Sequence, residues 1–170
     1  MPEQLPINDL MWPTVPRLLA QHRYLVLGTV DPTGTPWITP VFFAPDGTDS
    51  VLWVSSPDSR HSRNLAHSPT VAITLFDSQA PIGKAEALYL ESTASQVDDT
   101  AQSAALELLN SRLPTEKHLD LADVGPAGLL RIYRASIQQH HVLIRGGDPR
   151  FDNPVDTRLA VTPPPEEATR

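Results

Sequence analysis

Alternating apolar and polar positions predict β-strands along most of the chain. YLVLGTV (residues 24–30) is apolar and β-branched, and the turn residues DPTG separate it from TPWITPVFFA (35–44). This pattern predicts a hairpin, and VLWVSS (51–56) returns after a second turn as the third strand of an antiparallel meander. Parallel pairing is not expected, because it needs a long crossover and none is present. Further strands are predicted at residues 70–77, 84–97 and 129–144.

Three shorter segments have the periodicity and end signals of helices: residues 13–22, 59–67 and 98–113. Six or so short strands with two or three small helices are typical of a closed or nearly closed antiparallel barrel, so the fold class expected is mainly β with small helices. A ligand of such a small barrel is expected in an outer cleft or at an interface between chains. The predicted organisation is an N-terminal helical arm (1–23), a barrel (24–145) and an irregular C-terminal tail (146–170).

The amino-acid composition argues against several classes of function. The 170 residues are 40% hydrophobic and 19% charged, with a formal net charge of −7 and no cysteine. The acidic balance argues against binding to nucleic acid or to an anionic membrane, and the missing cysteines exclude disulfides and thiolate metal sites. No apolar run approaches the roughly 20 residues of a spanning helix, and MPEQLPINDLMW does not resemble a secretory signal. We therefore expect a soluble, cytoplasmic protein.

Positive charge gathers in SSPDSRHSRNL (55–65), directly after a predicted strand. A helix that begins at Ser59 would point free backbone N–H groups at the preceding turn, Ser55 and Ser59 add hydroxyls, and two arginines add charge-assisted donors. These groups together would suit a bound phosphate. The same letters also describe a solvated helix with a serine N-cap, and the local pattern by itself favours that simpler interpretation.

The order of three longer segments favours the phosphate-binding interpretation instead: GTVDPTGTPWITPVFF (28–43), VLWVSSPDSRHSRNLAHSPTVAITLFD (51–77) and LYLESTASQVDD (88–99). Together they resemble the pyridoxamine 5′-phosphate oxidase-like family of FMN-binding split β-barrels, over roughly residues 20–145. The resemblance implies an FMN cofactor at the subunit interface of a homodimer. It also implies hydride transfer through the flavin to or from a small organic molecule.

Carried over residue by residue, the resemblance implies a set of cofactor-binding positions. The flavin phosphate would lie on Ser59, Arg60 and Arg63, with His61 and Asn64 close by. The isoalloxazine and ribityl chain would follow Thr39, Pro40, Val41 and Phe42, while Val54 and Ser55 border the same groove. The segment that approaches from the next strand would contribute Lys84, Glu86 and Ala87. No catalytic side chain and no metal site are predicted.

Three alternatives remain open within the same fold. An F420-dependent reductase would need basic groups for a longer acidic tail, such as Arg17, Arg23 or Lys84. A haem-binding barrel would need an axial ligand such as His140 or His141, which point to opposite faces of a strand and are otherwise expected to bond to neighbouring backbone. A non-enzymatic flavin-binding protein would use the same phosphate cradle.

Residues outside this set have simpler expectations. Trp37 and Trp53 are expected in core or dimer packing. The C-terminal segment offers Arg150 and Arg158 but no tryptophan, so turnover of pyridoxamine phosphate itself is not expected.

Overall fold

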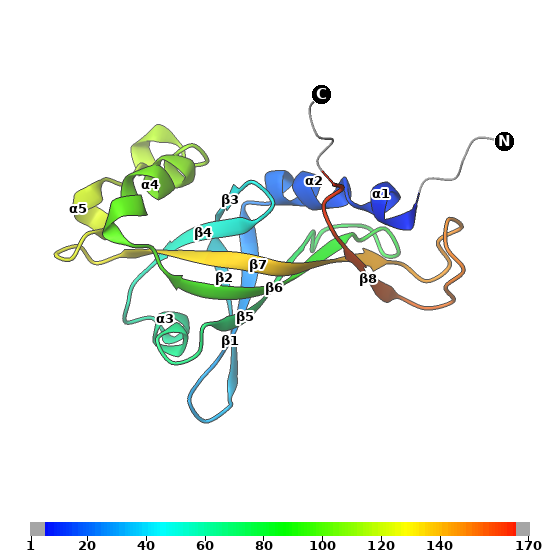
Figure 1. Cartoon of the computed structure of the whole chain (residues 1–170), viewed down its shortest axis with the longest axis horizontal. Coiled ribbons are helices and arrows are strands. Elements are labelled where there is room, and N and C mark those ends of the chain that lie inside the picture. The colour runs from blue at the N-terminus through cyan, green and yellow to red at the C-terminus, as the bar shows by residue number, and fades with distance from the viewer. Residues whose placement is uncertain (1–5, 166–170) are drawn as a thin grey trace.

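The computed structural model describes residues 6–165, so the first five residues of the predicted arm and the last five of the predicted tail lie outside the described residues. Eight strands form one antiparallel sheet that curls into a half-open barrel (Figure 1). The order along the sheet is β2-β1-β5-β6-β7-β4-β3, with β8 beside β7. The strands are β1 (Tyr24–Val30), β2 (Pro36–Phe42), β3 (Ala44–Asp46), β4 (Ser50–Ser55), β5 (Thr70–Phe76), β6 (Ala87–Gln96), β7 (Arg131–Ile144) and β8 (Thr157–Val161). The predicted fold class is confirmed.

The two ends of the sheet are joined through the chain itself. Only Phe43 separates β2 from β3, yet β2 pairs with β1 while β3 pairs with β4. Both hairpins of the predicted meander are present, but its middle strand is divided at Phe43, so β4 lies between β3 and β7 rather than beside β2. The fully buried Phe43 side chain anchors the point where the chain passes from one sheet edge to the other.

The three predicted helices are present in shorter form. They are α2 (Thr14–Gln21), α3 (Arg60–Leu65) and α4 (Gln102–Asn110), the last preceded by a 3₁₀ turn at Asp99–Ala101. Short additional segments are α1 (Ile7–Met11), a 3₁₀ turn at Thr115–Lys117 and α5 (Leu121–Val124). In the view of Figure 1, α1 and α2 lie on one side of the barrel and α3 lies on the other. No helix within residues 6–165 combines the length and apolar character needed to cross a membrane.

The C-terminal segment is more ordered than predicted. β8 pairs with the far end of β7, from His140 opposite Val161 to Ile144 opposite Thr157. The prediction of an irregular tail is therefore wrong for these residues. The reason is the length of β7: β4 pairs only with Arg131–Ser136, so the remaining edge of β7 offers free backbone groups, which β8 satisfies.

Side chains that alternate inward along the strands fill the barrel. In β1, Leu25 and Leu27 are fully buried, and Trp53 stacks on Tyr133 with ring centroids 5.7 Å apart. Trp53 thus lies in the core, as expected, whereas Trp37 is 38% exposed and does not. A second apolar cluster lies beneath α4 and α5. The interior is packed, so a ligand must bind outside the barrel.

Candidate functional site

Residues 55–65, where positive charge gathers in the sequence, form a polar cluster at the point where β4 ends and α3 begins. Ser59 is the N-cap of α3: its hydroxyl accepts a bond from the Ser62 backbone N–H and donates to the Ser62 hydroxyl, at 3.3 and 2.8 Å. Ser55 is the last residue of β4 and is half-buried. The strand–turn–helix arrangement and the serine cap predicted from sequence are confirmed.

His61 joins the two serines. Its ring is buried, and Nε2 lies 2.8 Å from Ser55 Oγ and 3.1 Å from Ser59 Oγ. Burial lowers the pKa of His61 below its usual value, so the ring is neutral at physiological pH. The structure therefore gives His61 the role of positioning two hydroxyls, rather than that of a cationic contact.

Arg60, half-buried at the start of α3, is one of the two cationic side chains of this helix. Its guanidinium lies over the Trp37 ring, 4.5 Å from the centroid, and reaches Asp31 Oδ2 at 3.4 Å. Asp31 is itself held by Thr33 and Thr35; a hydrogen bond from the Thr33 side chain is the main reason why the pKa of Asp31 is lowered. The stacking fixes the plane of Arg60 and leaves most of its N–H donors free of partners within residues 6–165.

The other two predicted phosphate residues of α3 have hydrogen-bond partners of their own. The Arg63 side chain donates to the backbone carbonyl of Asp58, at the turn that precedes the helix. Asn64 is buried, and its Nδ2 donates to Thr29 Oγ1 at 3.0 Å, which ties α3 to β1. Arg63 stabilises the turn and Asn64 stabilises the helix–strand contact.

The predicted groove residues of β2 divide between two faces, because successive side chains of a strand point in opposite directions. Val41 is buried in the core and Thr39 is half-buried on the same side. Pro40 pairs with Val26 on the outer side, and Phe42 makes an edge-to-face contact with Tyr24 at 6.1 Å. The predicted groove residue Val54, near the end of β4, packs against the second apolar cluster.

The remaining predicted residues, Lys84, Glu86 and Ala87, lie far from α3 within one chain. Ala87 pairs with Phe76 at the end of β5, whereas α3 leads into Thr70 at its start. A strand of seven residues spans about 20 Å. The structure therefore brings Ser55, Ser59, Arg60 and His61 together, but it does not bring the 84–87 segment to them.

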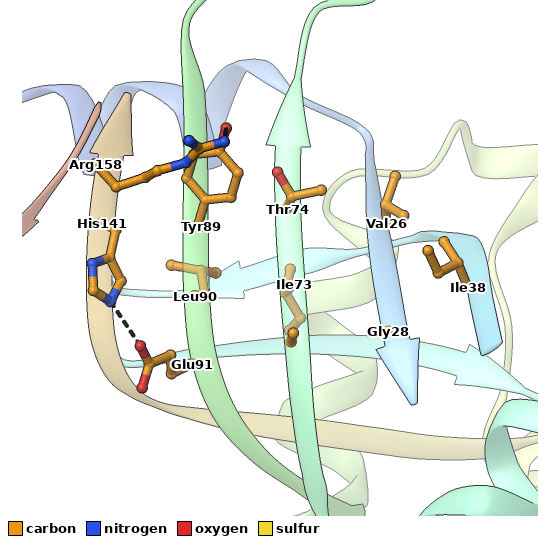
Figure 2. A pocket seen from close by; sticks show the side chains of 11 residues that line it. Val26, Gly28, Ile38, Ile73, Thr74, Tyr89, Leu90, Glu91, His141 and Arg158 are labelled. Carbon is orange, nitrogen blue, oxygen red and sulfur yellow. Dashed lines mark hydrogen bonds and ion pairs between the residues drawn. The ribbon is translucent and has the colours of Figure 1, made fainter. Parts of the chain in front are cut away.

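Sequence reasoning missed a cavity on the outer face of the sheet, of about 480 Å³ (Figure 2). Its floor is apolar, with the small residues Gly28 and Ala72 side by side on β1 and β5. At one end His141 bonds to Glu91 at 2.9 Å, and Arg158 lies over the Tyr89 ring. The alternation of β1 and β5 was visible in the sequence, but the register that aligns these residues was not.

The two candidate haem ligands lie on opposite faces of β7. His141 faces this cavity, whereas His140 is buried on the inner side, where its Nε2 meets the Thr48 carbonyl at 2.8 Å and its ring packs against Trp12. The predicted opposite orientation is confirmed. The expected backbone bond holds for His140 alone, so only His141 faces an open cavity.

A second hollow of about 620 Å³ continues the first toward the β1–β2 hairpin and shares Gly28, Ile38, Ala72 and Glu91 with it. We call the two together the outer trough. Large apolar side chains are exposed in or beside it: Ile38 is 66% exposed and Tyr24 63%. Among residues 6–165, no three histidine or acidic side chains gather closely enough to hold a metal ion.

Known structures share this fold at low sequence identity. A haem-binding protein from Mycobacterium smegmatis matches with a TM-score of 0.68 and 17% identity, over 87% of this chain and 56% of that one. A FAD-binding protein from Mesorhizobium loti matches with a TM-score of 0.57 and 14% identity, over 75% and 89%. An F420 reductase matches with a TM-score of 0.55 and 24% identity, over 73% and 93%. Members of one fold thus include proteins named for three different cofactors.

A search of curated proteins gave no match to the sequence. The family model described as pyridoxamine 5′-phosphate oxidase, in contrast, matches residues 11–141, which span β1 to β6 and most of β7. The sequence match agrees with the curled antiparallel sheet. This chain belongs to the pyridoxamine 5′-phosphate oxidase family of split β-barrels.

Proposed function

We propose that this protein binds FMN and acts as a flavin-dependent oxidoreductase on a small organic molecule. The observation that carries the proposal is the placement of Arg60 at the start of α3, where its guanidinium lies over the Trp37 ring. A planar guanidinium with free donors is the group best suited to bidentate contact with a phosphate. Family membership supports the same interpretation.

The residues at the start of α3 fit a phosphate group in number and chemistry. Arg60 offers charge-assisted donors, and Ser55 offers a hydroxyl whose partner within the described residues is His61 alone. The Ser59 hydroxyl already serves the helix cap, so its share would be smaller than the sequence implied. Asp31 is the opposing group, because it competes with a phosphate for Arg60.

In this proposal the protein contributes binding and orientation, since a flavin supplies the hydride chemistry itself. Arg60 and Ser55 hold the phosphate, and the exposed parts of β2 border the rest of the cofactor. His61 keeps the Ser55 hydroxyl in place. No side chain in this region is placed as a proton donor or acceptor for a substrate.

We further propose that the protein is a homodimer in which a second copy covers the outer trough. Ile38, Tyr24 and Phe76 are exposed on this face to 66%, 63% and 46%. A contiguous apolar face of this kind is unfavourable in water and is typical of an interface.

The test is an absorbance spectrum from about 300 to 700 nm after the protein has been mixed with FMN, F420 or hemin and then desalted. The proposal predicts that FMN absorbance is retained and that Arg60→Ala reduces it, while the matched variant Arg63→Ala retains it. Retention of F420 in place of FMN, or of FMN equally by both variants, would contradict the assignment.

Haem binding is a second candidate, because His141 faces an apolar cavity of about 480 Å³. An imidazole that faces an apolar pocket is a common haem ligand. Its hydrogen bond to Glu91 would orient the ring. This candidate predicts a Soret band with hemin that His141→Ala abolishes and His140→Ala leaves in place, and a wild-type protein without a Soret band would eliminate it.

A further inference from the structure

His61 lies beneath the hydroxyl groups of the proposed phosphate site, and the residue is only 6% exposed. Its Nε2 is within hydrogen-bond distance of both Ser55 Oγ and Ser59 Oγ, whereas its Nδ1 has no hydrogen-bond partner among residues 6–165. Histidine is the side chain whose charge changes most readily near neutral pH. The ring therefore lies where its protonation state can influence an anion bound to the two serines.

The hydrogen bonds of Ser59 determine which ring nitrogen of His61 carries the proton. The Ser59 hydroxyl donates to Ser62 Oγ at 2.8 Å, so its own proton is not available to the ring. Nε2 is then the donor in its contact with Ser59, and the same N–H is shared with Ser55 Oγ. The Ser55 hydroxyl thus keeps its own proton for an anion, and Nδ1 is the ring atom that can take up a second proton.

Within the described residues, His61 has no counter-ion. β1 and β2, which pack against α3, carry no titratable side chain except Tyr24, at the end of β1 remote from Thr29 and α3. The charged side chains of the surrounding segments come from α3, from the two nearby turns and from the strand beside Ser55: Arg60, Arg63, Asp58, Asp31 and Arg131. Asp31 is paired with Arg60, and Arg131 donates to three backbone carbonyls. None of them bonds to the ring, and burial lowers the pKa of His61.

A phosphate group would supply the missing counter-ion. Only the Ser55 hydroxyl would separate the His61 ring from a phosphate to which that hydroxyl donates. An opposite charge at such close range favours the charged form of a titratable group. The effect is reciprocal: a phosphate favours the protonated ring, and the protonated ring favours the bound phosphate to the same extent.

We propose that His61 takes up a proton when a phosphate group binds at the start of α3, so that the affinity for FMN increases as the solution becomes mildly acidic. This inference rests on the proposed FMN site and adds a titratable control of its affinity. The proton comes from solvent and goes to Nδ1, while Nε2 continues to donate to the serine hydroxyls. His61 is thus a positioning residue whose charge acts through Ser55.

The test is calorimetric titration of the full chain with FMN in two buffers of different ionisation enthalpy, which gives the number of protons taken up on binding. The phosphate of FMN itself loses a proton near pH 6, so the wild-type protein is compared with His61→Gln, in which that contribution is the same. At about pH 6 the wild-type protein should take up more protons than His61→Gln. The ratio of their FMN affinities should rise about fivefold between about pH 7.5 and about pH 5.5. The matched control His67→Gln changes an exposed histidine just after α3 and should behave like the wild-type protein.

A second measurement uses only the wild-type protein, so it does not depend on the folding of a variant. The histidine ring signals are followed by NMR as a function of pH, once with FMN and once with riboflavin, which lacks the phosphate. One histidine should titrate at a higher pH with FMN than with riboflavin.

The results that overturn the inference differ from those that overturn the FMN site. Histidine signals that titrate alike with FMN and with riboflavin would overturn the inference, and so would equal proton uptake by the wild-type protein and folded His61→Gln. FMN bound no more tightly than riboflavin would contradict the proposed phosphate site, and the inference with it.

Discussion

The cluster at the start of α3 and the outer trough are two exposed regions of one barrel, and they are built in opposite ways. In the cluster, polar side chains satisfy one another: His61 joins Ser55 and Ser59, and Trp37 fixes Arg60. In the trough, apolar side chains such as Ile38 meet water directly. A polar cluster is stable in an isolated chain, whereas an apolar face of that size requires a cover.

The two regions differ in whether a single chain completes them. The cluster is organised before any ligand arrives, so binding there requires little rearrangement. The trough, in contrast, offers apolar contact area with few polar groups to orient a ligand, apart from the end where His141 and Arg158 lie. We therefore propose that the cluster provides ligand specificity and that the trough mediates assembly.

The largest effect is expected at the core beneath both regions. Trp53→Ala should lower the free energy of unfolding by about 3–5 kcal/mol, because it empties a fully buried site stacked on Tyr133. Trp37→Ala, at a 38% exposed position, should cost far less stability but should weaken FMN binding, since Arg60 loses its support. Urea denaturation followed by flavin titration measures both, and equal loss of stability in the two variants would contradict the assignment.

The two arginines of α3 should differ in their effect on FMN. Arg60→Ala should lower the affinity by about 1.5–3 kcal/mol, the value of a hydrogen bond to a charged group. Arg63→Ala should change it little, because that side chain is turned to the Asp58 carbonyl. Fluorescence titration of the two single variants checks this difference. A larger effect at Arg63 would show that the turn rearranges when the cofactor binds.

The role of the trough is tested by placing a charge in it. Ile38→Asp should weaken self-association by at least about tenfold, because the charge would have to be buried in an apolar interface. The control Ile82→Asp changes another exposed isoleucine, outside the trough. Sedimentation or light scattering over a range of concentrations gives the result. Self-association unchanged in Ile38→Asp would exclude the trough as the interface.

The smallest effect is a dependence of stability on pH. Burial lowers the pKa of both His61 and His140 in the folded state, relative to the usual value of 6.5. As the pH falls below about 6.5, the unfolded chain takes up these protons first, so stability decreases until the folded-state values are passed. His61→Gln should reduce this decrease, measured as the urea midpoint between pH 7.5 and 5. His67→Gln, at an exposed position, is the control, and an identical decrease in both variants would be inconsistent with a buried neutral His61.

Local patterns predicted the local structure well. The β1–β2 hairpin and the serine-capped α3 follow from alternation, turn residues and an N-cap that lie within a few positions of one another. The pairing of β4 with β7 was not predictable, because it joins residues far apart in the sequence. The pairing of β7 with β8 was missed because the segment after Gly147 is rich in Asp, Pro and Arg, which indicates an irregular segment. Register between such strands depends on side-chain packing across the barrel, which a single sequence does not display.

The candidate site, too, was predicted only where its residues are close together in the sequence. Ser55, Ser59 and Arg60 lie within six positions, and their proximity was predicted. The contacts of Arg60 with Trp37 and Asp31 were not, since they depend on how the hairpin packs against α3. Burial also changed a predicted role: His61 was expected beside the phosphate but lies beneath the two serines.

The most direct test of the central proposal is a comparison of FMN with riboflavin, which differ only in the phosphate. Titration of the wild-type protein with each ligand, followed by flavin fluorescence, gives the two dissociation constants. If Arg60 and the start of α3 hold the phosphate, FMN should bind about 100-fold more tightly than riboflavin, and Arg60→Ala should remove most of that difference. Equal affinities for FMN and riboflavin in the wild-type protein would contradict the proposal.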